Sequence, residues 1–116
     1  MSKVFLTHPI RMRFKYVALC FLLVQLAACC EADKISQNIQ SLQHASPKVR
    51  NQAALDLAGC GERASKAVPL LGTLLYDENV GVQSSAAYAL RKIDTPQARA
   101  LIDAAVARKN AGRKTP

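Results

Sequence analysis

The pattern of "SPKVRNQAALDLAGC", residues 46–60, occurs twice in the chain. The stretch "NVGVQSSAAYALRKI", residues 79–93, repeats its apolar positions at a constant offset, so that Val49 corresponds to Val82 and Leu57 to Leu90. The alanine pair between them corresponds at the same offset. Apolar residues spaced three and four apart lie on one face of a helix. The two stretches therefore predict two equivalent amphipathic helices.

Each of these stretches precedes a second apolar segment. One helix is predicted from about Ala64 to Tyr76, with Pro69 near its start, where a missing N–H costs least. The other follows "DTP" and continues to about Arg108. The inward positions are Val68, Leu71, Leu74 and Leu75 in the first segment and Leu101, Ile102, Ala105 and Val106 in the second. A period of about 31–33 residues with two helices per unit indicates a helical solenoid.

A shorter helix is predicted in front of the first stretch, since Ile35, Ile39 and Leu42 are spaced four and three apart. Ser46 and Pro47 suit the N-cap and the first helical position, and "GCG" at 59–61 suits a helix end. No run alternates apolar and polar residues as a strand requires. We expect an all-α chain, a short α-solenoid of about two and a half helix pairs.

The pattern resembles HEAT repeats, in the short bacterial form that phycobilisome lyases also contain. Val49-Arg50, Ala53-Ala54, Leu57 and Gly59 carry the motif in one unit, and Asp77, Val82, Ala86-Ala87 and Leu90 carry it in the other. The resemblance covers about residues 34–107. It implies stacked helix pairs whose surfaces bind other proteins. It concerns the scaffold, and a shared fold does not carry lyase activity over.

Two positions depart from the HEAT pattern. The first unit has His44 where the family has Asp, and the second has Gln83 where the family has Arg. The resemblance implies a ladder of these Asp and Arg side chains between units. Here Arg50 and Asp77 are expected to pair between the two units, and the ladder cannot extend further. Because about three repeats are usually needed for stability, the domain is expected to be marginal alone or supported by a partner.

Residues 1–28 have the layout of a secretory signal peptide. Residues 1–16 are basic, and residues 17–28 are apolar apart from Gln25. A membrane-spanning helix needs about 20 apolar residues, so this run is too short. A cationic head, a short apolar core and then small residues are typical of a signal. The competing interpretation is a buried N-terminal helix, which the crowded cations disfavour. Met12 is an alternative start that leaves the mature protein unchanged.

The end of this signal, "LAAC" at residues 26–29, resembles the lipobox of bacterial lipoproteins. The resemblance implies that Cys29 is lipidated through its thiol and becomes the first residue, followed by a short tether over 29–33. Cys30 is not the Asp that retains lipoproteins in the inner membrane, which suggests outer-membrane sorting facing the periplasm in a Gram-negative source. The alternative is ordinary cleavage after Ala28 or Ala32, which gives a soluble secreted or periplasmic protein.

The net charge of +8 does not describe a basic binding face. Four cations lie before the apolar run and four more, Arg108, Lys109, Arg113 and Lys114, lie near the end, whereas the stretch between them has eight bases and eight acids. A nucleic-acid partner is therefore not expected. The basic tail, residues 108–116, is interpreted as a solvated end; its functional alternative is contact with an acidic partner or anionic head groups.

The sequence contains no clear catalytic or metal-binding pattern, and no cofactor is expected. His44, the histidine that remains after signal removal, lies at a repeat turn and is interpreted as a turn residue. We expect Cys60 to fill a small apolar gap; a disulfide to Cys30 and a reactive thiol are the alternatives. An accessory or lyase-like factor that uses Cys60 or His44 is therefore the rival of a non-enzymatic scaffold.

The sequence thus favours a small, lipid-anchored interaction module with an unknown protein partner and an unknown oligomeric state. In HEAT geometry the second helix of each unit lines the concave side. The candidate contact residues on these helices are Arg63, Lys66, Thr73, Arg99 and Asp103.

Overall fold

The computed structural model describes residues 30–114, and this part of the chain contains helices and no strand. The elements are α3 (Ala32–Ser41), α4 (Pro47–Gly59), the 3₁₀ helix η2 (Gly61–Ala67), α5 (Val68–Leu74), α6 (Val80–Ile93) and α7 (Pro96–Arg113). The expected signal peptide and Cys29 lie outside the described residues.

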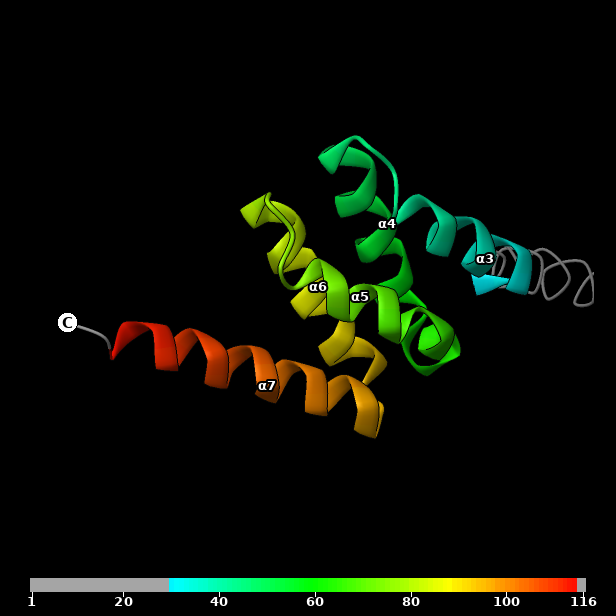
Figure 1. Ribbon diagram of the computed structural model, residues 1–116. Helices are drawn as coiled ribbons and strands as arrows, with labels where there is room; N and C mark the ends of the chain where they lie inside the picture. Colours follow the sequence, from blue (N-terminus) through cyan, green and yellow to red (C-terminus); the bar gives the residue numbers. More distant parts are fainter. Residues whose placement is uncertain (1–29, 115–116) are drawn as a thin grey trace, which may run out of the picture.

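The helices stack as a short solenoid (Figure 1). The two repeated stretches form α4 and α6, which pack against each other more extensively than any other pair of described elements. The intervening and flanking helices complete the units, because α3 packs on α4, α5 packs on α6, and α7 packs on α6 and α5. The prediction of an all-α chain with a short HEAT-like solenoid is confirmed.

The core contains both small and large apolar residues. Alanines allow α4 and α6 to approach closely, since Ala53, Ala54, Ala86 and Ala89 are all buried. The largest fully buried side chains are Leu42, Leu57, Leu71, Leu90, Ile93, Val68 and Val82. Leu57 and Leu90 occupy equivalent positions of the two units, so the sequence repeat is also a repeat of the core.

The single helix expected from Ala64 to Tyr76 is divided into η2 and α5. Gly61 adopts a left-handed φ of 55° just after α4, and Ala64 has non-helical dihedral angles inside η2. Pro69, in the first turn of α5, has no N–H to donate to the preceding turn, and its ring would clash with the carbonyl of Ser65 in a continuous α-helix. Pro69 therefore starts a new α-helix instead of continuing an existing one.

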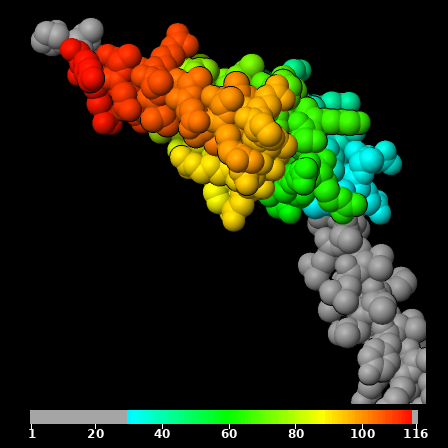
Figure 2. Space-filling view, turned by 90° about the horizontal axis from the view of Figure 1, so that it is seen from below, coloured from blue at the N-terminus to red at the C-terminus, as the bar shows by residue number. Residues whose placement is uncertain are grey.

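Helix α7 differs from the prediction in length and in burial. It continues to Arg113, beyond the expected end near Arg108, so the first part of the basic tail is helical. Its apolar face was expected to point inward, but Leu101, Ile102 and Ala105 are half-buried and Val106 is 50% exposed. The C-terminal half of α7 projects beyond the rest of the domain (Figures 1 and 2). Among residues 30–114, no helix after α7 covers this face.

Candidate functional site

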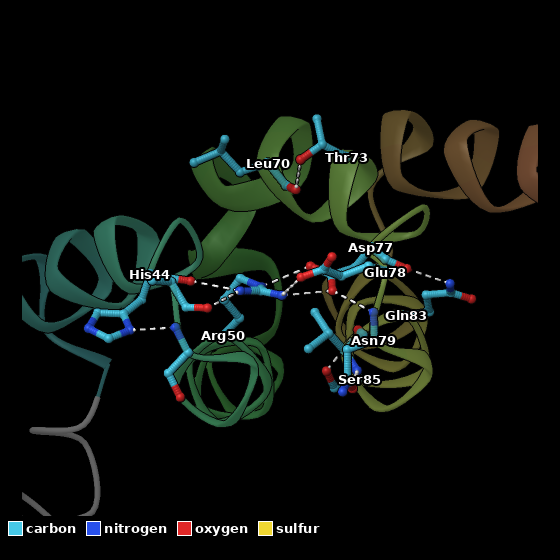
Figure 3. A network of polar contacts seen from close by, with 12 residues as sticks. His44, Arg50, Leu70, Thr73, Asp77, Glu78, Asn79, Gln83 and Ser85 are labelled. Atoms are coloured by element: carbon cyan, nitrogen blue, oxygen red, sulfur yellow. Dashed lines mark hydrogen bonds and ion pairs between the residues drawn. The ribbon is translucent and has the colours of Figure 1, made fainter.

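Arg50 links the two units from the first turn of α4 (Figure 3). Its Nε donates to Asp77 Oδ2 at 2.8 Å and its Nη2 donates to Asp77 Oδ1 at 2.9 Å. Both side chains are at most 10% exposed. The hydrogen bonds from Arg50 hold the pKa of Asp77 below its ordinary value, and the same bonds raise the pKa of Arg50.

The same guanidinium also hydrogen-bonds the turn between α3 and α4. Arg50 Nη1 donates to the carbonyl oxygens of His44 and Ala45 at 2.8 and 2.9 Å. Glu78 lies farther from it, with its Oε1 4.0 Å from Arg50 Nη2. A planar fork with five N–H donors suits this arrangement, because one side chain satisfies a carboxylate and two backbone carbonyls together.

The two residues that depart from the HEAT pattern, His44 and Gln83, each make a hydrogen bond that is also seen at the equivalent position of the other unit. Asp77 Oδ1 accepts from the backbone N–H of Asn79 at 2.9 Å, and at the equivalent turn His44 Nδ1 accepts from the N–H of Ser46 at 3.0 Å. Gln83 Nε2 donates to the carbonyl of Asp77 at 2.6 Å, as Arg50 does to that of His44. His44 and Gln83 therefore preserve the two turns, whereas neither adds a second bidentate ion pair.

Cys60 forms a disulfide with Cys30, which corrects the expectation that it only fills an apolar gap. Cys60 is 7% exposed and belongs to the core, and Cys30 is half-buried against that core. The bond joins the residue just before α3 to the end of α4, across 30 residues of sequence. The segment expected to be a tether over 29–33 is thus held to the domain at Cys30, and α3 begins at Ala32.

The comparison with protein families matches this architecture. Residues 35–115 match the family model described as HEAT repeats. The chain belongs to the HEAT-repeat family. HEAT repeats commonly serve as protein-interaction or scaffold modules. No curated protein and no solved structure matched the chain.

The five candidate contact residues of this HEAT-repeat chain are all exposed. Arg63 and Lys66 lie on η2, Thr73 on α5, and Arg99 and Asp103 on α7. Two of them have local polar contacts: Thr73 Oγ1 donates to the carbonyl of Leu70 at 2.7 Å, and Arg99 pairs with Asp94 at 3.1 Å. The structure thus distributes these residues over three elements instead of gathering them into one cluster.

Sequence reasoning missed a hollow of about 560 Å³ between α6 and α7. We call it the α6–α7 groove; its lining includes Val80, Ala87 and Arg91 of α6 and Ile102, Val106 and Lys109 of α7. The repeat alignment contained a signal for it, because the sequence predicts inward apolar positions on the last helix, and the described residues include no later helix that could cover them.

Two further observations concern the described part of this HEAT-repeat chain. Between residues 30 and 114, no three His, Cys, Asp or Glu side chains are grouped so that they could hold a metal ion. None of the helices described is long and apolar enough to cross a membrane.

Proposed function

We propose that this chain is a small, secreted, lipid-anchored HEAT-repeat protein that acts by binding another protein and has no enzymatic activity of its own. The observation that carries the proposal is the exposure of polar and charged side chains along the second helices. Lys66, Thr73 and Asp103 face solvent on η2, α5 and α7, while Arg50 and Asp77 are engaged within the domain. Exposed side chains on a rigid helical stack are the kind of surface that solenoids use to bind partners.

The disulfide supports the secreted part of the proposal. Disulfides persist in oxidising compartments and are rare in the cytosol. The Cys30–Cys60 bond therefore fits a chain in which residues 1–28 direct the protein out of the cytoplasm, into the cell envelope.

Lipid attachment at Cys29 would place the anchor directly beside this disulfide, since Cys30 is the next residue. The first helix of the domain begins at Ala32. An anchored form would consequently hold its helices close to the membrane surface, with no long flexible spacer. In a Gram-negative cell we propose the outer membrane, with the domain facing the periplasm.

The rival, an accessory or lyase-like factor, needs a reactive Cys60 or His44. A cysteine acts as a nucleophile through its thiolate, and in the disulfide Cys60 has none. One ring nitrogen of His44 already accepts the N–H of Ser46. No observation favours this rival over the interaction module.

In-cell photo-crosslinking tests the binding function. A photoreactive residue is placed at Lys66, Thr73 or Asp103, and at Leu55 as a control on a first helix, where the native side chain is 40% exposed. The proposal expects one discrete crosslinked protein from the three second-helix positions and none from Leu55. The same diffuse products at all four positions would contradict it.

Incorporation of labelled palmitate tests the anchor separately. The wild type is expected to take up label, and Cys29→Ala is expected to lose it. An unlabelled wild type would contradict lipid anchoring. It would not affect the binding function, which the crosslinking experiment tests.

A further inference from the structure

The α6–α7 groove is the open end of the solenoid, where a third unit would stack. In the first unit, the surface equivalent to this groove is formed by α4 and α5, and α6 packs against both. Ala54 and Leu71 are completely buried there. At the equivalent positions of the second unit, Ala87 and Ile102 are only half-buried. The same surface is therefore covered by a helix in one unit and uncovered in the other.

The groove retains the apolar character of a helix-packing surface. Val80 is 71% exposed and Val106 is 50% exposed, and they lie on the two opposite helices that form its walls. Tyr76, 52% exposed, also lines it. Large apolar side chains gathered in one hollow are typical of a binding site, whereas single exposed ones need no explanation.

The charge of the groove differs from that of its equivalent in the first unit. Arg91, Arg108 and Lys109 line it, and none of the described residues that line it is acidic. When the second helices of the two units are aligned, Arg108 and Lys109 occupy the places of Asp77 and Glu78. Arg108 also lies over the ring of Tyr76, 5.0 Å from its centre, so its cation is held against an aromatic ring that lines the groove.

We propose that the α6–α7 groove binds an acidic amphipathic helix of a partner protein, which stacks on the solenoid as a third unit would. This inference rests on the proposed binding function and adds a second contact surface and the chemistry of the partner segment that it takes. The helical form follows from the equivalence with the surface that α6 covers, and the acidic character follows from the three cations. A second copy of the chain is a poorer occupant, because isologous pairing of this face would bring the same cations together.

A peptide that copies α6 provides a defined probe. The peptide comprises residues 80–93 and keeps the face of α6 that packs on α4 and α5. A hydrocarbon staple between the exposed positions 84 and 88 holds the peptide helical. Glutamates replace the exposed residues Gly81, Arg91 and Lys92. A matched peptide has lysines at these three positions. Binding to the purified, disulfide-bonded protein is measured by fluorescence anisotropy.

Each feature of the proposal has a matched variant. Val106→Asp puts a carboxylate in the groove, and Leu55→Asp puts one on another exposed apolar position outside it. Arg108→Glu with Lys109→Glu reverses the charge of the groove, and Lys34→Glu with Lys48→Glu makes the same change at exposed positions of α3 and α4 outside it. Circular dichroism checks that every variant keeps its helices.

The proposal expects the glutamate peptide to bind and the lysine peptide to bind at least about tenfold more weakly. The two groove variants should weaken binding of the glutamate peptide by about tenfold or more, and the two control variants should leave it unchanged. Equal binding of both peptides, no binding up to about 1 mM, or insensitivity to Val106→Asp would overturn the proposal.

Two other outcomes would assign the groove to a different occupant and overturn the proposal as well. One is self-association in sedimentation equilibrium that Val106→Asp abolishes. The other is groove-dependent binding to anionic phosphatidylglycerol vesicles without peptide binding. Neither result touches the proposed function, because second-helix crosslinking reports on that function independently of the groove.

Discussion

The guanidinium of Arg50 donates to both carboxylate oxygens of Asp77, 27 residues away, and thereby joins the turns that open the two units. Each partner also has a local role, because Arg50 bonds the carbonyls of His44 and Ala45, and Asp77 accepts the N–H of Asn79. One ion pair thus fixes both inter-unit register and turn geometry.

Arg50→Ala should lower the midpoint of urea unfolding markedly, because it removes four hydrogen bonds and leaves a buried carboxylate without its partner. Arg50→Lys should restore only part of the loss, since an ammonium cannot make the bidentate contact. The double variant Arg50→Met with Asp77→Leu should be less destabilised than the sum of the single variants Arg50→Met and Asp77→Leu. An unchanged midpoint in Arg50→Ala would contradict the structural role of the pair.

The ion pair should also make stability depend on acid pH. Because the pKa of Asp77 is lower in the folded state than in the unfolded state, its stabilisation is complete above the unfolded pKa of about 4 and is lost as pH falls through the folded pKa. Urea unfolding of the wild type and Asp77→Asn, from pH 7 to about 2.5, should give a difference that narrows only below about pH 4. A difference that stays constant over this range would exclude the ion pair as its source.

Reduction of the Cys30–Cys60 bond should destabilise the domain by about 3–4 kcal/mol, as expected for a closed loop of this length. The measurement is urea unfolding with and without dithiothreitol. Cys30→Ser with Cys60→Ser is the control, because it should start from the lower stability and not respond to the reductant. If the wild type unfolds identically in both conditions, the bond contributes nothing to folding.

The first helices of the two units, α4 and α6, offer a matched test of N-capping. Asn79 Oδ1 accepts the N–H of Val82 at 3.2 Å, whereas Ser46 makes no side-chain cap bond at the equivalent position of α4. Asn79→Ala should therefore cost about 1 kcal/mol of stability, and Ser46→Ala should cost clearly less. Thermal unfolding monitored by circular dichroism compares them directly, and equal losses would show that the side-chain bond of Asn79 is not the cause.

The fold could be predicted from the sequence because the same apolar pattern occurs in both units. The constant offset between the two repeated stretches located α4 and α6 and their buried leucines, since a packed helical face needs apolar residues at fixed spacing. The division between η2 and α5 was harder to predict. Proline is acceptable in the first turn of any helix, so Pro69 fitted a single helix that begins near Ala64 as well as a new helix that begins at Val68.

The site depended on information that periodicity does not contain. Arg50 and Asp77 came from the family pattern, whereas the bond between Cys30 and Cys60 depends on how the chain before α3 returns to the end of α4. The groove depends on which described helices pack beside α7. A helical pattern predicts an apolar face and does not specify whether another helix covers it, so Val106 was expected inside and lies half exposed.

Quantitative in-cell crosslinking of the full chain, from two surfaces and a control position, measures whether this HEAT-repeat chain binds another protein. Photoreactive residues at Thr73 and Val106 report on the second-helix surface and on the α6–α7 groove, and one at Leu55 reports on neither. We expect Thr73 and Val106 to capture the same single protein, with the Val106 crosslink on an acidic helical segment of it, and Leu55 to capture none. Indistinguishable products from all three positions would show that neither surface binds a specific protein.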